Sequence, residues 1–142
     1  RLLGEVLPLW FARSLKTQPQ DGSKATYTRP VTKEDGIINW QMSAGEISRR
    51  VRAFYPWPGT HTWWQGNLLK ILQAVPLHKE GNLLPGKVVA LLPGQPAVVG
   101  VETGDGILGL LRLQLEGKRA LTAAEFLSGQ RTFVGSTLGS VS

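Results

Sequence analysis

The stretch RRVRAFYPWPG, residues 49–59, joins the basic end of a predicted helix to two prolines, and the residues that follow it have strand periodicity. Ser43 and Glu46, three residues apart, form the capping-box pattern, so we expect a helix to begin after Ser43. Pro56 and Pro58 cannot continue that helix, because proline has no backbone N–H to donate. The stretch therefore predicts a rigid junction between a helix and the first strand of a sheet.

The predicted helix has one apolar face and one charged face. Residues at three- and four-residue spacing share a face of a helix. The apolar positions at this spacing, which we expect to face the core, are Ile47, Val51 and Phe54. Arg50 is expected to lie near this apolar stripe, whereas Arg49 and Arg52 share a more exposed side.

Downstream of the prolines, short segments with strand patterns alternate with turns rich in glycine and proline. We expect strands over residues 61–64, 68–75, 86–92, 97–102 and 107–115, with a loop over 76–81. In the last strand, Leu111, Leu113 and Leu115 alternate with polar residues. Several short strands of this kind favour a small closed or nearly closed barrel, which leaves no exposed sheet edge.

The C-terminal part begins with a second capping box, Thr122 with Glu125, which predicts a short final helix with an apolar face. Beyond Gly129 the sequence offers at most one more strand, around residues 132–134, and we expect the last residues to be loose. The predicted fold class is therefore mainly β, a small barrel with two or three short helices.

The first 30 residues differ in character from the rest. Residues 1–15 carry apolar side chains at helical spacing despite Pro8, so they predict an amphipathic helix. This helix packs either on the chain's own core or on a neighbouring domain, and the sequence leaves both arrangements open. Residues 17–30 are polar and predict an extended linker. Because the chain begins inside an apolar pattern and its only methionine is Met42, we interpret it as a fragment.

Composition limits what the chain can do. Its 142 residues suit one ordinary domain, and without cysteine it has neither a disulfide nor a cysteine–zinc site. With only two histidines, we expect no metal site. Sixteen basic against ten acidic residues give a net charge of +6, which favours attraction to polyanions. No apolar run is long enough to span a membrane, so we expect a soluble, intracellular protein without a membrane partner.

No sequence pattern predicts a catalytic site. Residues 104–109 match the dinucleotide motif G-x-G-x-x-G, but a strand rather than a helix is expected to follow. We interpret residues 104–106 as a tight hairpin turn with positive backbone angles. His61 and His78 have no acid or nucleophile at a motif spacing, and the carboxylates are mostly explained by caps and turns. We therefore predict no catalytic residue.

The arrangement of positive charge is the strongest functional signal. Cations on a helix end, a strand and a loop can follow a phosphate backbone, and arginine meets phosphate oxygens in pairs. The candidate nucleic-acid-binding residues are Lys24, Arg49, Arg50, Arg52, Lys70, Lys118 and Arg119. The alternative is an ordinary solvated surface. Three aromatic residues could stack on bases, but we expect at least two of them to lie in the core: Trp57, Trp63 and Trp64.

A series of short motifs extends over nearly the whole chain. They are QPQD (residues 18–21), ATY (25–27), KEDGIINW (33–40), SAGEI (43–47), RAFYPWPG (52–59), PGK (85–87), TGDGIL (103–108), GKRAL (117–121) and EFL (125–127). Together they resemble the C-terminal part of the methionyl-tRNA formyltransferase family. The early motifs are shared with sugar and folate relatives, whereas TGDGIL and GKRAL are more particular to the tRNA enzymes.

This resemblance implies three parts: the last helix of a missing N-terminal catalytic domain (residues 1–15), an interdomain linker (16–32) and an OB-like barrel domain (33–142). In the family, the Rossmann-like catalytic domain transfers a formyl group from 10-formyltetrahydrofolate to the methionine of initiator methionyl-tRNA during translation initiation. The catalytic Asn, His and Asp and the S-L-L-P loop of that domain have no match in this sequence.

The resemblance further implies that this part binds tRNA through a positively charged surface. It implies a chain that holds no cofactor, is inactive alone and has two partners, initiator methionyl-tRNA and the missing domain. We expect a monomer in the bacterial cytoplasm, or in an organelle.

Two other functions stay open at this point. The barrel could be a scaffold in a related sugar-nucleotide or folate formyltransferase, where it need not touch nucleic acid. It could also be a free-standing OB-fold module for single-stranded nucleic acid. That second function requires Trp63 and Trp64 to be exposed on a barrel face.

Overall fold

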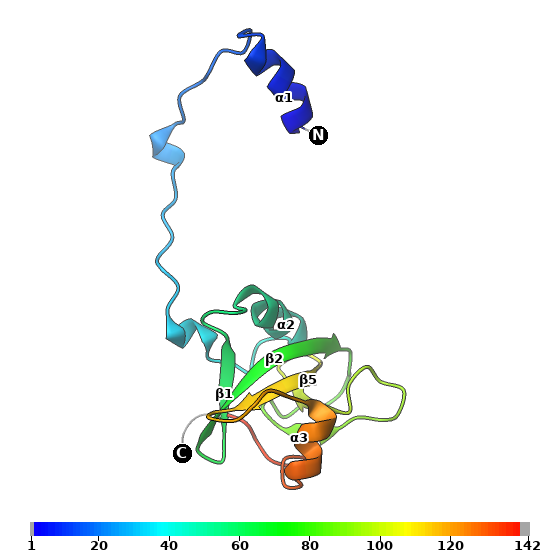
Figure 1. Cartoon of the computed structure of the whole chain (residues 1–142). Coiled ribbons are helices and arrows are strands. Elements are labelled where there is room, and N and C mark those ends of the chain that lie inside the picture. The colour runs from blue at the N-terminus through cyan, green and yellow to red at the C-terminus, as the bar shows by residue number, and fades with distance from the viewer. Residues whose placement is uncertain (1, 140–142) are drawn as a thin grey trace. The chain divides into compact units, whose positions relative to one another are not determined.

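The computed structural model describes residues 2–139 and divides the chain into two compact units, Arg1–Pro30 and Val31–Ser142. The first unit contains helix α1 (Leu2–Phe11) and a short 3-10 turn, η1 (Gly22–Lys24). All other helices and strands belong to the second unit (Figure 1). The division lies close to the barrel start expected at residue 33, and the boundaries of the three expected parts stay predictions.

Helix α1 is shorter than the predicted helix over residues 1–15, because it ends at Phe11. Arg13 adopts a left-handed backbone angle (φ 54°), and the Arg13 and Ser14 N–H groups donate to carbonyl oxygens of the last helical turn. Such a left-handed residue is a common way for a helix to end. No residue of α1 is buried.

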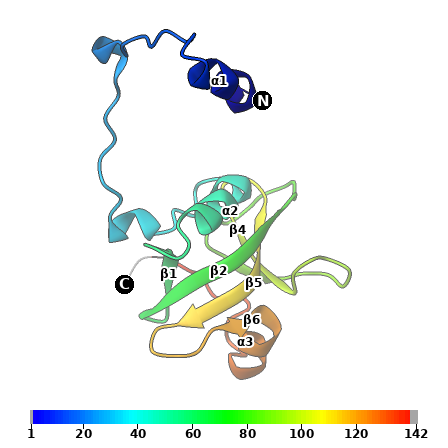
Figure 2. The same cartoon turned by 45° about the horizontal axis from the view of Figure 1, so that its top comes forward.

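The second unit begins with a 3-10 turn, η2 (Lys33–Gly36), and continues with two helices and the strands of a sheet: α2 (Ala44–Ala53), β1 (Thr60–Trp64), β2 (Asn67–Leu77), β3 (Val88–Ala90), β4 (Val99–Glu102), β5 (Ile107–Leu115), β6 (Leu121–Thr122) and α3 (Ala123–Gly129). The strands form one antiparallel sheet in the order β1-β2-β5-β4-β3, with β6 paired to β5. Figure 2 shows α2 and α3 on opposite sides of this curled sheet. The predicted fold class, mainly β with a small barrel-like sheet and short helices, is confirmed.

Both predicted capping boxes are present. The Ser43 hydroxyl accepts from the Glu46 N–H, while the Glu46 carboxylate accepts from the Ser43 N–H. Thr122 and Glu125 repeat this exchange at the start of α3. The Ser43 and Thr122 hydroxyls also donate to these carboxylates, and the hydrogen bonds from hydroxyl and backbone N–H together hold the pKa of each carboxyl group below its ordinary value, because they favour the charged form. Both helix starts are therefore set by interactions within one turn.

The buried face of α2 matches the prediction at Ile47 and Val51, whereas Phe54, also expected to face the core, is only half-buried. The buried residues are Ala44, Ile47, Ser48 and Val51. Arg50 is exposed, so the expectation that it lies near the apolar stripe is wrong. Ser48 takes that place instead, and its hydroxyl donates to the Ala74 carbonyl oxygen in β2 (3.4 Å). Helical spacing allows either Ser48 or Arg50 to lie beside the apolar stripe, and the packing of α2 against β2 buries Ser48.

The β1–β2 hairpin turns at Gln65 and Gly66, whose φ angles of 49° and 75° suit a two-residue hairpin turn. Strand β2 then continues to Leu77, so the loop expected from Pro76 onward is wrong. Pro76 lies opposite Leu108 in the pairing of β2 with β5. The longer strand extends the pairing of β2 with β5 as far as Leu77 and Ile107.

Strand β5 has the predicted bounds, and the predicted alternation holds in its second half, where Leu113 is buried, Leu115 packs against the core and Arg112 is exposed, but not in its first half. Its register with β2 shifts on both sides of Gln73. As a result Leu108, Leu110 and Leu113 are fully buried, whereas Leu111 is only half-buried. A shift of one residue exchanges the two faces of a strand, and the sequence pattern alone does not show where the shift occurs.

The turn between β4 and β5 uses its glycines differently from the expectation. Gly106 has the expected positive φ (79°), but Gly104 does not have one. Gly104 instead provides room, because a Cβ atom there would overlap the Gln41 carbonyl group. The Ala44 N–H donates to the Asp105 carbonyl oxygen (2.9 Å). The turn thus fastens the start of α2 to the sheet.

The residues up to Gly139 belong to the barrel, so the expectation of a loose end is wrong for them. The Leu138 N–H donates to the Gly86 carbonyl oxygen just before β3 (2.8 Å). The Gly139 N–H donates to the Trp63 carbonyl oxygen in β1 (3.2 Å). This segment therefore bridges the two edges of the sheet; residues 140–142 lie outside the described part of the chain.

An aromatic cluster fills the core beside α3. Trp64 lies edge-on to Phe126 and Phe133, with ring centroids 5.9 and 5.2 Å away. Phe133 is fully buried in a turn, where a further strand was expected. Trp63 is half-buried and Trp57 is 58% exposed. The expectation that at least two of the three tryptophans lie in the core is therefore wrong, because only Trp64 does.

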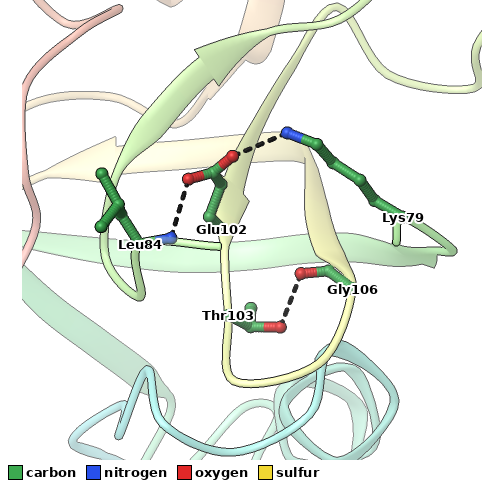
Figure 3. A network of polar contacts seen from close by, with 5 residues as sticks. All are labelled: Lys79, Leu84, Glu102, Thr103 and Gly106. Carbon is green, nitrogen blue, oxygen red and sulfur yellow. Dashed lines mark hydrogen bonds and ion pairs between the residues drawn. The ribbon is translucent and has the colours of Figure 1, made fainter. Parts of the chain in front are cut away.

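A buried carboxylate fastens the loop between β2 and β3. Glu102, at the end of β4, is 6% exposed, and its oxygens accept hydrogen bonds from the Lys79 ammonium (2.7 Å) and the Leu84 N–H (3.0 Å) (Figure 3). The bond from Lys79 holds the pKa of Glu102 below its ordinary value. The neighbouring Thr103 hydroxyl donates to the Gly106 carbonyl oxygen (2.8 Å). One strand end thereby holds both a long loop and a tight turn.

Candidate nucleic-acid interface

Two adjoining hollows on the second unit form what we call the basic groove. Val51, Tyr55 and Leu72 line both hollows. The first hollow is completed by Arg52, Gln73, Arg112 and Ala120. The second is completed by Pro56, Pro58, Gly59, Thr60, Lys70, Ile71 and Gln114. The groove thus lies between the end of α2 and strands β2 and β5.

The groove has three cations, Arg52, Lys70 and Arg112, and the periodicity of the helix or strand that carries each one places it on the exposed face. Arg52 occupies the last turn of α2 and is exposed, one residue after a buried valine. Lys70 and Arg112 each precede a fully buried residue of their strand, so alternation places both side chains on the exposed face. Two long neighbouring strands and one helix end therefore bring these cations to one surface.

The positive charge of the groove is not compensated. Within residues 2–139, Arg52, Lys70 and Arg112 have no carboxylate partner within 4.0 Å, and no acidic residue lines either hollow. Arg112 does influence one acid, Glu125. The pKa of Glu125 is lowered first by its capping hydrogen bonds and further by the charges of Arg119 and Arg112. Cations left without a partner attract a polyanion most strongly at low salt.

Lys118 and Arg119 adjoin the groove through Gln114. The Gln114 side chain lines the second hollow, and its Nε2 donates to the Lys118 carbonyl oxygen (2.9 Å). Lys118 and Arg119 also line a third hollow beside α3, whose walls include Leu121 and Phe126. Both cations are exposed. The turn after β5 therefore extends the positive surface beyond the groove.

The other candidate residues do not line these hollows. Arg49 and Arg50 are exposed on α2 and lower the pKa of Glu46 slightly, after its capping hydrogen bonds. Lys24 belongs to the first unit and forms an ion pair with Asp21 (3.6 Å). Four of the seven candidate cations therefore lie in or beside the groove, and the nucleic-acid role of all seven stays a prediction.

Sequence reasoning missed two residues of the groove. The sequence pattern identifies Arg112 only as a polar position in the alternation of residues 107–115. The sequence pattern places Tyr55 only in the proline junction, whereas in the structure it is 69% exposed and lines both hollows. An arginine flanked by leucines in a central strand is a usable signal for Arg112. Tyr55 carries no such local signal, because its place depends on β2 packing below it.

The structure offers no sign of a metal site within residues 2–139, since no three His, Cys, Asp or Glu side chains gather there. His61 is half-buried and lies edge-on to Trp63 (centroids 5.5 Å apart), and burial lowers its pKa. His78 is exposed, with Glu80 as its partner at 3.4 Å. None of the helices in this part of the chain is long and apolar enough to cross a membrane.

The requirement of a free-standing module for single-stranded nucleic acid is not met. That function needs Trp63 and Trp64 on an open barrel face. Trp64 is 4% exposed and packs against two phenylalanines, so it cannot stack on a base. Trp63 is half-buried, so the barrel face does not offer the two exposed tryptophan rings that this function requires.

The fold and the groove define the class of this protein as a small, mainly β barrel domain with an uncompensated basic surface. The chain belongs to the family of formyl transferase C-terminal domains, whose sequence model matches residues 30–131. The matched range contains α2, the whole sheet and α3. It ends before the C-terminal segment that bridges β1 and β3.

The chain is similar in sequence to curated proteins named methionyl-tRNA formyltransferase. One from Dehalococcoides mccartyi (strain ATCC BAA-2266) is 51% identical over 120 residues, which cover 84% of this chain and 38% of the relative. One from Roseiflexus sp. (strain RS-1) is 40% identical over 142 residues, which cover 99% of this chain and 42% of the relative. The chain thus spans about two fifths of the length of these relatives. These matches confirm the family resemblance of the sequence motifs.

Solved structures with a similar fold include HypX from Aquifex aeolicus. A variant of that protein matches with a TM-score of 0.63 and 22% identity, over 94% of this chain and 23% of HypX. HypX in complex with tetrahydrofolic acid matches with a TM-score of 0.62 and 21% identity, over 93% of this chain and 23% of HypX. At this identity the likeness establishes the fold of the chain alone.

Proposed function

We propose that this chain is the tRNA-binding, non-catalytic C-terminal part of a methionyl-tRNA formyltransferase. The curated relatives support the enzyme, and the uncompensated cations of the basic groove support the tRNA contact. The whole enzyme would transfer the formyl group of 10-formyltetrahydrofolate to the amino group of initiator methionyl-tRNA. An upstream Rossmann-like domain would hold the folate and perform the chemistry.

In this proposal the chain holds the tRNA mainly by its phosphate backbone. Phosphate contacts fix the position of a nucleic acid without reading its sequence. Arg52, Lys70 and Arg112 suit this role because they lie on a rigid scaffold and have no competing carboxylate within 4.0 Å among residues 2–139. The chain would work as a monomer in a bacterial cytoplasm, be inactive alone, and leave selection of the initiator tRNA to the joined catalytic domain.

The salt dependence of tRNA binding tests this proposal. We expect the chain to bind tRNA weakly, with log affinity falling linearly against log salt concentration. Arg52→Ala and Arg112→Ala should each weaken binding to any tRNA alike and reduce the slope by about 0.7–0.9 for each phosphate that is no longer neutralised. Arg49→Ala and Lys118→Ala measure the same effect for candidates outside the groove. Filter binding or fluorescence anisotropy at several salt concentrations gives both quantities.

Arg131→Ala is the matched control, because Arg131 is also exposed and lines none of the three hollows. It should change affinity and slope less than the groove variants do. Absence of tRNA binding at low salt, or binding that salt does not weaken, would refute the proposed function. Equal effects of Arg131→Ala and Arg52→Ala would refute the assignment of the groove.

A further inference from the structure

Among residues 2–139, Tyr55 is the one aromatic side chain that lines both hollows of the basic groove. It is 69% exposed and stands two residues after α2. Arg52 and Arg112 share the first hollow with it, and Lys70 shares the second. An open aromatic ring therefore stands between cations on two sides.

The two hollows offer the ring a neighbourhood that suits a nucleotide. Leu72 lies beside Tyr55 in both hollows, so part of the wall is apolar. Gln73 in the first hollow and Gln114 in the second carry amide groups, which can donate to and accept from the edge of a base. Base stacking on an aromatic ring accepts any base, because every base has a π-face.

A duplex cannot use this ring in the same way. Bases within a double helix are stacked on their neighbours, so a duplex presents phosphates and sugars to the groove. An unpaired nucleotide can turn its base out and stack it on an aromatic side chain, which is the common mode for single-stranded RNA. The three cations fit both kinds of RNA, whereas the ring discriminates between them.

We propose that Tyr55 is a stacking platform for an unpaired nucleotide of RNA, with the flanking phosphates held by Arg52 and Arg112 on one side and by Lys70 on the other. This inference rests on the proposed function and adds the kind of RNA segment that the groove takes. The unpaired nucleotide belongs either to the single-stranded 3′ end of a tRNA or to a loop, and the chemistry of recognition is the same for both.

Binding of paired and unpaired RNA by the intact chain tests the inference. The probes are a short single-stranded RNA and a duplex that contains the same sequence. Tyr55→Ala and Tyr55→Leu should weaken binding of the single strand by about 5- to 150-fold, the range expected for loss of one stacked base. Both variants should change binding of the duplex by less than about twofold, since the cations remain. Tyr55→Phe keeps the ring and should bind like the unchanged chain.

Two controls test whether the loss is specific to Tyr55 and whether the fold is intact, and a cross-link tests the contact itself. Tyr27→Ala removes the other tyrosine of the chain, which is 96% exposed in the first unit and lines neither hollow. Thermal unfolding of the Tyr55 variants should match that of the unchanged chain, because most of the Tyr55 side chain is already in water. A photoreactive uridine in the single strand should cross-link to the peptide that contains Tyr55.

The source of the unpaired nucleotide is settled by two tRNA probes, one complete and one trimmed of its single-stranded 3′ end. A Tyr55→Ala effect that disappears on trimming assigns the 3′ end, and an effect that persists assigns a loop. Equal losses for single strand and duplex, or no loss for either, would overturn the stacking role while tRNA binding through the cations stands. A chain that binds no RNA at all overturns both proposals.

Discussion

Glu102 is a single side chain that holds separate parts of the molecule together. Its oxygens accept from Lys79 and from the Leu84 backbone, so the loop after β2 is tied to the end of β4. A buried carboxylate is stable only when it is paired and hydrogen-bonded. The bond from Lys79 lowers the pKa of Glu102, because it favours the charged form. The attachment of this loop to β4 therefore depends on the charged form of Glu102.

Glu102→Gln should lower the free energy of unfolding by about 1–3 kcal/mol at neutral pH, because an amide has one oxygen and its NH2 group must face either the Lys79 ammonium or the Leu84 N–H, both of which are donors. The carboxyl has a lower pKa in the folded state than its ordinary value of 4.5. Its contribution is therefore complete above pH 4.5 and is lost as the pH falls through the folded pKa. Urea unfolding between neutral and acidic pH measures both effects.

Glu116→Gln is the control for this experiment, since Glu116 is an exposed carboxylate in the turn after β5. It should leave stability nearly unchanged and keep the acid dependence of the unchanged chain. The gap between Glu102→Gln and the unchanged chain should narrow below pH 4.5. A gap of constant size across the whole pH range would contradict the role of the Glu102 charge.

At the scale of elements, the C-terminal segment, residues 130–139, contributes both backbone hydrogen bonds and buried side chains to the barrel. Leu138 and Gly139 bridge the β3 side and the β1 side of the sheet through backbone hydrogen bonds. Phe133 and Leu138 are both buried in the core. The segment has no regular strand pattern of its own, because its residues alternate between a turn and isolated bridges. It joins the two edge strands of the sheet and adds two side chains to the core.

Truncating the buried side chains of this segment should destabilise the whole barrel. Phe133→Ala should cost about 3–5 kcal/mol and Leu138→Ala about 2–5 kcal/mol of unfolding free energy, as expected for cavities in a packed core. Val134→Ala, at a position that is 39% exposed, should cost less than about 1 kcal/mol. Thermal or urea unfolding measures all three. Similar losses for Val134→Ala and Leu138→Ala would mean that the segment is not part of the core.

The whole molecule consists of two units that differ in packing. The second unit has the core, the sheet and the basic groove, whereas no residue of α1 is buried in the first. Residues 25–30 are exposed and have no regular structure. Exposed irregular backbone is the preferred substrate of proteases, so the two units should differ sharply in protease sensitivity.

Brief digestion with trypsin should cut first after Arg13, Lys16 or Lys24 and leave the second unit whole. The bond after Arg29 should resist, because Pro30 follows it. Mass spectrometry of the early products identifies the cuts, and circular dichroism of the surviving fragment shows whether the barrel stays folded. Early cuts at Lys79 or Lys118, before any in the first unit, would contradict this division of the chain.

Local features of the fold could be predicted because each depends on a few neighbouring residues. Both capping boxes and the bounds of β5 are examples. The faces of β5 could be predicted only in part, because the pairing of β2 with β5 shifts on both sides of Gln73 and skips Leu111. Likewise, the side-chain periodicity of α2 does not distinguish Ser48 from Arg50 without the β2 strand it packs against.

The candidate interface was predictable only in part for the same reason. Arg52 and Lys70 were visible as exposed cations, but their meeting in one groove with Arg112 requires the pairing of β2 with β5. Tyr55 is a candidate for stacking because of the hollow on either side of it rather than because of its neighbours in sequence. Positive charge is a property of composition, whereas a groove is a property of packing.

The sequence by itself determined the mainly β class, the helix starts and the family, because caps, turns and motifs act over a few residues. Only the tertiary structure decided that Glu102 is buried in a charged state, that the segment ending at Gly139 bridges the sheet edges, and that Tyr55 stands between cations. The physical reason is the same in each case. Burial, register and the surroundings of a charge are set by residues far apart in the chain, which meet only when the barrel forms.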